Sequence, residues 1–85
     1  MTVFYFSAPW CGPCKTFKPI VEEVSRELGV PINDINVDYD ATFAQKYDVT
    51  SIPTLIILDG YGNVAYRKTG VLGKDQVKNA LTSFK

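Results

Sequence analysis

The sequence contains no histidine and only two cysteines among its 85 residues, and its charges cancel. Nine basic residues balance nine acidic ones, so neither a basic surface for nucleic acid nor an acidic tail is expected. Without histidine, two cysteines cannot complete a four-ligand zinc site within one chain. A metal or cluster bridging two chains is the remaining metal alternative. We expect no metal and no other cofactor, and partners recognised by shape and apolar contact.

Long apolar runs are also missing. The apolar run nearest the N-terminus, residues 3–6, is too short for a signal peptide or a membrane span. Two cysteines are too few for the disulfide framework of a small secreted protein, whereas one active pair fits a reducing cytosol. We therefore expect a cytoplasmic protein that binds no membrane. With 46% hydrophobic and 13% aromatic residues, the chain has enough apolar side chains to form a buried core. We expect one domain over residues 1–85.

Both cysteines lie in one five-residue run, Trp10-Cys11-Gly12-Pro13-Cys14. Residues three positions apart on a helical turn face the same side and lie roughly 5–6 Å apart, inside the Cα–Cα range that a disulfide tolerates. An apolar, strand-like segment over residues 2–7 precedes the pair, and an amphipathic segment over residues 15–28 follows it. The pair therefore lies at a strand-to-helix junction, which is the context of a redox-active dithiol.

The rest of the chain alternates between strand and helix patterns. The first strand is apolar on both faces, which favours a central position, whereas the polar segment at 32–38 favours an edge. Gly29 predicts the end of the first helix, and Asp48 a left-handed residue after the second. The order is βαβαββα, an α/β domain, with these elements: strand 2–7, helix 15–28, strand 32–38, helix 40–47, strand 53–58, strand 64–68 and helix 74–84.

The chain resembles the thioredoxins. The resemblance covers nearly all of it and is carried by the Trp-Cys-Gly-Pro-Cys-Lys run at 10–15, the helix proline Pro19, and the segments 35–38, 44–47, 51–54 and 70–72. It implies a minimal thioredoxin-like fold, a four-stranded mixed sheet flanked by three helices, in a short form that lacks the family's N-terminal strand and helix. It also implies a protruding helix end at Cys11 and a cis-proline, Pro53, facing the disulfide.

Two positions depart from the family's pattern. The family's buried aspartate, six residues before the first cysteine, falls at Tyr5, and the lysine that pairs with it falls at Asp34. We hypothesise that Asp34 supplies the missing carboxylate for deprotonating Cys14, with the Tyr5 hydroxyl holding it or a water molecule. The alternative is that Asp34 is a solvated charge that protects an edge strand from aggregation.

Cys11 is the expected nucleophile and Cys14, one turn further in and less exposed, the resolving thiol. A helix N-terminus stabilises a thiolate by about 1–2 kcal/mol, which lowers a thiol pKa by about one unit. The thiolate fraction then rises about eightfold while its nucleophilicity falls about threefold, so the net gain is only about threefold. Pre-positioning of the second thiol must contribute more.

Seven further residues are candidates for substrate binding. Trp10 is expected to shield the disulfide and contact partners, rather than to be ordinary core. Pro13 starts the helix and tunes the disulfide, although a plain helix-start proline is the alternative. The backbone before the proline at 53 is expected to pair with an extended substrate, and Gly70 to allow its close approach rather than only a turn. The full set is Trp10, Gly12, Pro13, Ile52, Pro53, Gly70 and Val71.

The sequence therefore predicts a protein-disulfide reductase, a monomer that receives electrons from thioredoxin reductase or an equivalent donor and passes them to disulfide-bearing client proteins. A glutaredoxin-like, glutathione-coupled reductase is a second possibility, although Gly-Pro rather than Pro-aromatic separates the cysteines and no basic cluster suits glutathione. The third is a non-enzymatic thioredoxin-fold interaction subunit.

Overall fold

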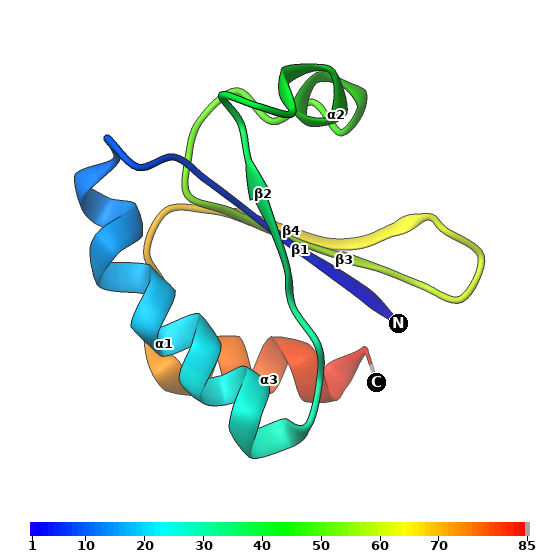
Figure 1. Ribbon diagram of the computed structural model, residues 1–85. Helices are drawn as coiled ribbons and strands as arrows, with labels where there is room; N and C mark the ends of the chain where they lie inside the picture. Colours follow the sequence, from blue (N-terminus) through cyan, green and yellow to red (C-terminus); the bar gives the residue numbers. More distant parts are fainter. Residues whose placement is uncertain (85) are drawn as a thin grey trace.

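A computed structural model describes residues 1–84 as a four-stranded sheet with helices on both faces. The strand order is β2-β1-β3-β4, with β1 and β2 parallel and the other pairs antiparallel. Helices α1 and α3 cover one face of the sheet and α2 covers the other (Figure 1). This arrangement confirms the predicted fold. The elements are β1 (Thr2–Ser7), α1 (Gly12–Leu28), β2 (Asn33–Asn36), α2 (Ala41–Lys46), β3 (Thr54–Leu58), β4 (Val64–Thr69) and α3 (Lys74–Ser83).

Strand β1 is central because both of its faces are apolar. Val3 and Tyr5 are fully buried in the cluster on the α1 and α3 side, and Phe6 is fully buried on the α2 side. Strand β3 is buried along its whole length and pairs with β1 on the other side from β2. The predicted edge position of β2 is therefore confirmed, since only β1 pairs with it among the described residues.

The α2 face is covered largely by aromatic rings. Phe4 lies 5.0 Å from Phe43 and 5.5 Å from Tyr47, measured between ring centroids, and Phe6 lies 6.0 Å from Phe43. The first pair is edge-on, the second tilted and the third stacked, and such pairs contribute about 0.5–1.5 kcal/mol each beyond their buried area. One helix of six residues can therefore close this face of the sheet.

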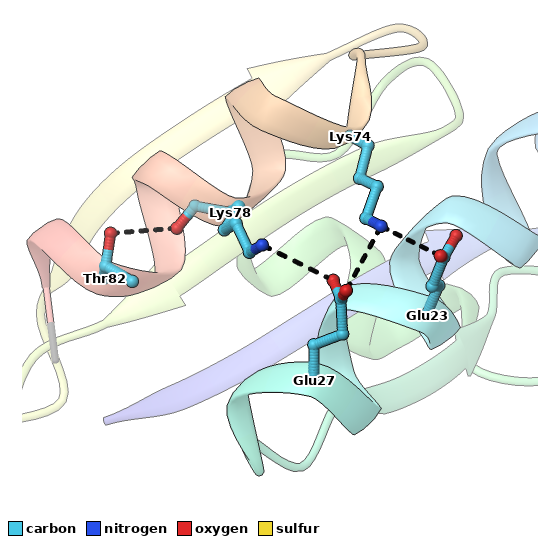
Figure 2. Close-up of polar contacts among 5 residues, drawn as sticks. All are labelled: Glu23, Glu27, Lys74, Lys78 and Thr82. Atoms are coloured by element: carbon cyan, nitrogen blue, oxygen red, sulfur yellow. Dashed lines mark hydrogen bonds and ion pairs between the residues drawn. The ribbon is translucent and has the colours of Figure 1, made fainter.

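On the opposite face, an ion-pair network joins α1 to α3 (Figure 2). The Lys74 ammonium lies 2.9 Å from Glu23 and 3.2 Å from Glu27, and Lys78 lies 3.7 Å from Glu27. The hydrogen bond and charge of Lys74 lower the pKa of Glu23, and the two carboxylates raise the pKa of Lys74. These side chains are exposed, so the network orients the two helices more than it stabilises them.

The structure confirms one predicted boundary near the cysteines and corrects another. The helix N-terminus was expected at or beside Cys11, and α1 begins at Gly12 with Cys11 as its N-cap; Pro13 fits in the first turn because it needs no hydrogen-bond acceptor for a backbone N–H. Strand β2 ends at Asn36 rather than at residue 38, because the Asn36 Oδ1 accepts the backbone N–H of Asp38 at 2.9 Å and turns the chain.

The other predicted boundaries agree with the structure to within a residue or two. Gly29 ends α1 in the left-handed conformation, with φ of 65°, and Asp48 has φ of 56°. Helix α2 covers 41–46, β3 starts at Thr54, β4 extends to Thr69 and α3 ends at Ser83. No helix in the described part of the chain has the length and apolar content needed to cross a membrane.

Candidate active site

The two cysteines form a disulfide at the start of α1. Their Cα atoms are 5.3 Å apart, as the spacing predicted. The chain turns sharply after β1, where the Cys11 N–H donates to the Ala8 carbonyl at 3.1 Å, and this turn places Cys11 at the N-cap. The pair thus lies where a central strand feeds the first turn of a 17-residue helix.

The Cys11 sulfur occupies the electrostatically favourable end of α1. It accepts the backbone N–H of Cys14 at 3.2 Å, and the first turn of the helix contains no acidic residue. Unpaired N–H groups and the helix dipole both favour negative charge at this position. This environment stabilises a thiolate on Cys11 once the disulfide is reduced.

The predicted difference in exposure between the two cysteines is wrong. Cys11 is 5% exposed and Cys14 is 4% exposed. Both pack with Ala8 against the partly buried Val37 and Ile52, because the disulfide draws the two sulfurs together under the same side chains. The two cysteines differ instead in their surroundings: Cys14 lines a hollow of the surface, whereas Cys11 does not.

Tyr5 lies beneath the second cysteine. Its ring is fully buried and packs edge-on against Phe17 at 5.7 Å, and its hydroxyl donates to the Cys14 carbonyl at 3.1 Å. Burial, followed by the negative charge of Asp34, raises the pKa of Tyr5 to about 12. Tyr5 is therefore a neutral phenol at physiological pH. Because its single proton goes to Cys14, it is not the donor that holds Asp34, and that part of the hypothesis is corrected.

A polar hollow of about 360 Å³ adjoins Cys14. Asp34 is the β2 register partner of Tyr5, so both residues face this hollow. The structure thus brings together three of the four predicted catalytic residues, Tyr5, Cys14 and Asp34. Lys15 and Lys18 also line it and were missed by the sequence analysis, although Lys18 is one helical turn after Cys14.

Trp10 lies on the other side of the disulfide and is 67% exposed, so it is not a core residue. Its indole N–H donates to Asp38 Oδ2 at 2.9 Å. The sequence analysis gave Asp38 no role; its place at the end of a polar strand, next to the turn, was the available signal. This bond orients the tryptophan ring beside the cysteines.

A second hollow, of about 330 Å³, lies beside Trp10. Among the described residues that line it, none is charged: they are Trp10, Val37, Val49, Thr50, Ser51 and Ile52. Since Val37 and Ile52 also pack on the cysteines, an apolar group in this hollow would lie close to the disulfide.

The remaining predicted binding residues border the same region. The Ile52–Pro53 peptide bond is cis, and the Gly70 N–H donates to the Pro53 carbonyl at 2.8 Å. Gly70 has φ of 100°, a conformation that favours glycine, and a Cβ there would meet open space. Val71 is exposed. Gly12 and Pro13 are exposed between the two cysteines, as the first residues of α1.

No described cluster of three or more His, Cys, Asp or Glu residues could hold a metal ion. The chemistry available is that of two sulfurs that can exchange two electrons while the backbone around them stays in place. The fold and the site together define a class: a redox protein whose dithiol sits on the first turn of the helix after a central strand.

Comparison with known proteins identifies the family within this class. The thioredoxin family model matches residues 1–83. Thioredoxin of Bacillus subtilis is 43% identical over 75 residues, which are 86% of this chain and 71% of that protein. Thioredoxin of Chlamydia pneumoniae is 42% identical over 77 residues, 89% of this chain and 74% of that protein. The X-ray structure of Fasciola hepatica thioredoxin superposes with a TM-score of 0.90 at 32% identity, covering 99% of this chain and 80% of that one.

The chain therefore belongs to the thioredoxin family. It is a thiol-disulfide oxidoreductase, a disulfide reductase with Cys11 and Cys14 as its redox pair. Family membership favours this activity over the glutathione-coupled and the non-enzymatic alternatives.

Proposed function

We propose that this protein reduces disulfides of client proteins with Cys11 as the nucleophile and Cys14 as the resolving thiol, and that thioredoxin reductase or an equivalent donor regenerates the dithiol. The supporting observation is the position of the Cys11 sulfur, which accepts a backbone N–H of the first turn of α1. We also propose that the chain acts as a monomeric single domain, residues 1–85, in the cytoplasm.

The cycle transfers two electrons to the client. The Cys11 thiolate attacks one client sulfur, forming a mixed disulfide and releasing the other client sulfur as a thiolate. Cys14 then gives up its proton and attacks the Cys11 sulfur. The Cys11–Cys14 bond forms, the mixed disulfide breaks, and the second client thiolate leaves; each client thiolate takes up a proton. The second step is intramolecular because both cysteines belong to one chain. The 5.3 Å separation of their Cα atoms keeps Cys14 within reach of the Cys11 sulfur.

Asp34 is the proposed acceptor of the Cys14 proton. Both residues line the polar hollow, and among the described residues there Asp34 is the one carboxylate. Tyr5 is a positioning residue in this proposal: its neutral hydroxyl holds the Cys14 carbonyl and so fixes the resolving cysteine. If Asp34 is instead only a charge on an edge strand, its removal leaves the resolving step unchanged.

Client proteins are proposed to dock on the side of the disulfide that carries Trp10 and the second hollow. Trp10 and Val71 offer exposed apolar surface there, and the hollow beside Trp10 can take an apolar client side chain. The backbone of Ile52, next to Pro53, and that of Gly70 are the proposed pairing sites for an extended client segment. Gly12 and Pro13 let the client approach the sulfurs over the start of α1.

The two single-cysteine variants test the assigned roles. Cys14→Ser is expected to stop after the first step and accumulate a covalent mixed disulfide with an oxidised client such as insulin. Cys11→Ser is expected to form no such adduct and to reduce no insulin. Both are expected to lose essentially all turnover with thioredoxin reductase and NADPH, measured as NADPH consumption.

Each variant keeps one thiol, so each is the matched control for the other. Adduct formation by Cys11→Ser at the rate of Cys14→Ser would contradict the assignment of the nucleophile.

A further inference from the structure

We propose that Thr69 is a positioning residue for client binding: it fixes the first of two loops, the one whose Ile52 packs on the cysteines, relative to the second loop, which begins at Gly70. The loops are residues 51–53, before β3, and residues 70–72, after β4. This inference rests on the proposed function, because it concerns how a client segment docks between these loops.

The paired strands β3 and β4 meet the two loops at one end of the sheet, where the first loop leads into β3 and the second leaves β4. Thr54 is the first residue of β3 and Thr69 the last of β4, and they are register partners. Their Oγ1 atoms are 3.2 Å apart. The contact therefore lies at the last rung of the sheet, directly before both loops.

The proton count decides the direction of this hydrogen bond. The Thr54 hydroxyl is 2.6 Å from the Ser51 carbonyl oxygen, which can only accept. Its single proton therefore goes to Ser51, and in the 3.2 Å contact Thr54 must accept while Thr69 donates. The result is a chain of two hydrogen bonds from the hydroxyl of Thr69 through Thr54 to the carbonyl of Ser51.

Thr54 is 1% exposed, so its hydroxyl depends on partners within the protein. Successive hydroxyl bonds of this kind polarise and strengthen one another. By donating to Thr54, the Thr69 hydroxyl thus strengthens the hydrogen bond from Thr54 to the Ser51 carbonyl, which holds the start of the first loop.

A second bond crosses between the same loops, from the Gly70 N–H to the Pro53 carbonyl at 2.8 Å. That bond joins the loops at the residues next to the strands, whereas the hydroxyl chain from Thr69 reaches the carbonyl of Ser51, two residues further along the first loop. The two contacts together hold the first loop at both of its ends. Since Ile52 lies between the two anchor points and packs on the cysteines, the position of this loop also sets where a docked client lies relative to the disulfide.

The substitution Thr69→Val removes the hydroxyl, keeps the branched shape and leaves the bond from Thr54 to Ser51 intact. The expected result is a rise in KM for insulin of about fivefold, the size of one lost neutral hydrogen bond, with kcat unchanged. The rate with the small disulfide 5,5′-dithiobis(2-nitrobenzoate) is expected to stay within a factor of about 1.5, because such a substrate reaches Cys11 without the loops.

Thr69→Ser is the matched control, because it keeps the donor and is expected to restore the wild-type KM. If Thr69 acts through Thr54, the KM of Thr54→Val/Thr69→Val equals that of Thr54→Val alone. An unchanged KM in Thr69→Val, an equal loss with both substrates, or no rescue by Thr69→Ser would each overturn the inference.

The same assays separate this inference from the proposed function. If the wild-type protein fails to reduce insulin, the proposed function fails, and the inference with it. If the wild-type protein is active and Thr69→Val matches it, only the inference fails.

Discussion

The two hollows beside the disulfide are similar in volume, about 360 and 330 Å³, but differ in chemistry. The one beside Cys14 contains Asp34, two lysines and a buried phenol, whereas the described lining of the one beside Trp10 carries no charge. Charged groups that exchange protons suit the first, and apolar client side chains suit the second. This difference supports the proposal that proton transfer and client recognition use different sides of the disulfide, the first near Cys14 and the second near Trp10.

The largest expected effect is on the stability of the protein at high pH and comes from Tyr5, which lines the hollow beside Cys14. In the folded protein its pKa is raised from 10.0 to about 12, mainly by burial. Above pH 10 the unfolded chain loses this proton while the folded protein keeps it, so stability is complete below pH 10 and falls as the pH rises towards 12. The full loss is about 2–3 kcal/mol.

Urea denaturation of the oxidised protein at pH 8 to 11.5 measures this loss, with Tyr5→Phe as the control. The variant is expected to be about 1 kcal/mol less stable at pH 8, because the Cys14 carbonyl loses its donor, and to lack the tyrosine part of the alkaline decline. Parallel pH curves for the two proteins would rule out this account of Tyr5.

Substitution of Asp34 tests whether its carboxylate accepts the proton of Cys14. Asp34→Asn is expected to slow the resolution of a mixed disulfide at pH 7 by about tenfold, less than the roughly hundredfold or more that is usual for general-base catalysis, because the carboxylate is exposed. Attack by Cys11 is expected to keep its rate. Stopped-flow measurement of the two steps at pH 5 to 9 separates them.

Asp48→Asn is a matched control for Asp34→Asn, since it makes the same change of charge at an exposed residue that is not among those lining the hollow, and asparagine tolerates the left-handed conformation there. If the resolution rate of Asp34→Asn has the same pH profile as that of the wild type, Asp34 takes no part in this step and is only a solvated charge on the edge strand.

The smallest expected effect is on client binding and comes from Trp10, which lines the second hollow. Trp10→Ala is expected to raise KM for insulin by about fivefold to tenfold, as for a partly exposed aromatic contact at an interface, with the rate of mixed-disulfide resolution unchanged. Asp38→Asn keeps an acceptor for the indole N–H and is expected to show a much smaller change. If Trp10→Ala slowed resolution as much as docking, the two sides would not be separate.

Much of this architecture could be predicted from the chain. Local signals were sufficient for the central position of β1, the end of α1 at Gly29 and the left-handed Asp48, because periodicity and backbone preference act within a few residues. The end of β2 was placed too late, since the turn there depends on the Asn36 side chain accepting the backbone N–H of Asp38.

The site was predicted less completely. The pairing of Cys11 with Cys14 followed from their spacing, and the neighbourhood of Tyr5 and Asp34 from the resemblance. The hydrogen bond from Trp10 to Asp38 joins residues 28 apart in sequence, and that between Thr54 and Thr69 residues 15 apart. No local pattern signals such contacts, because they depend on how separate elements are brought together.

By itself the sequence determined the redox pair, the order of strands and helices, and the replacement of an acidic side chain by a phenol at Tyr5. Only the tertiary structure decided that both cysteines are equally buried, that one hollow adjoins Cys14 and a second, without charged lining, adjoins Trp10, and that the Tyr5 proton goes to Cys14 rather than to Asp34. The reason is physical: side-chain type and periodicity are local properties, whereas burial and hydrogen-bond partners are properties of the packed whole.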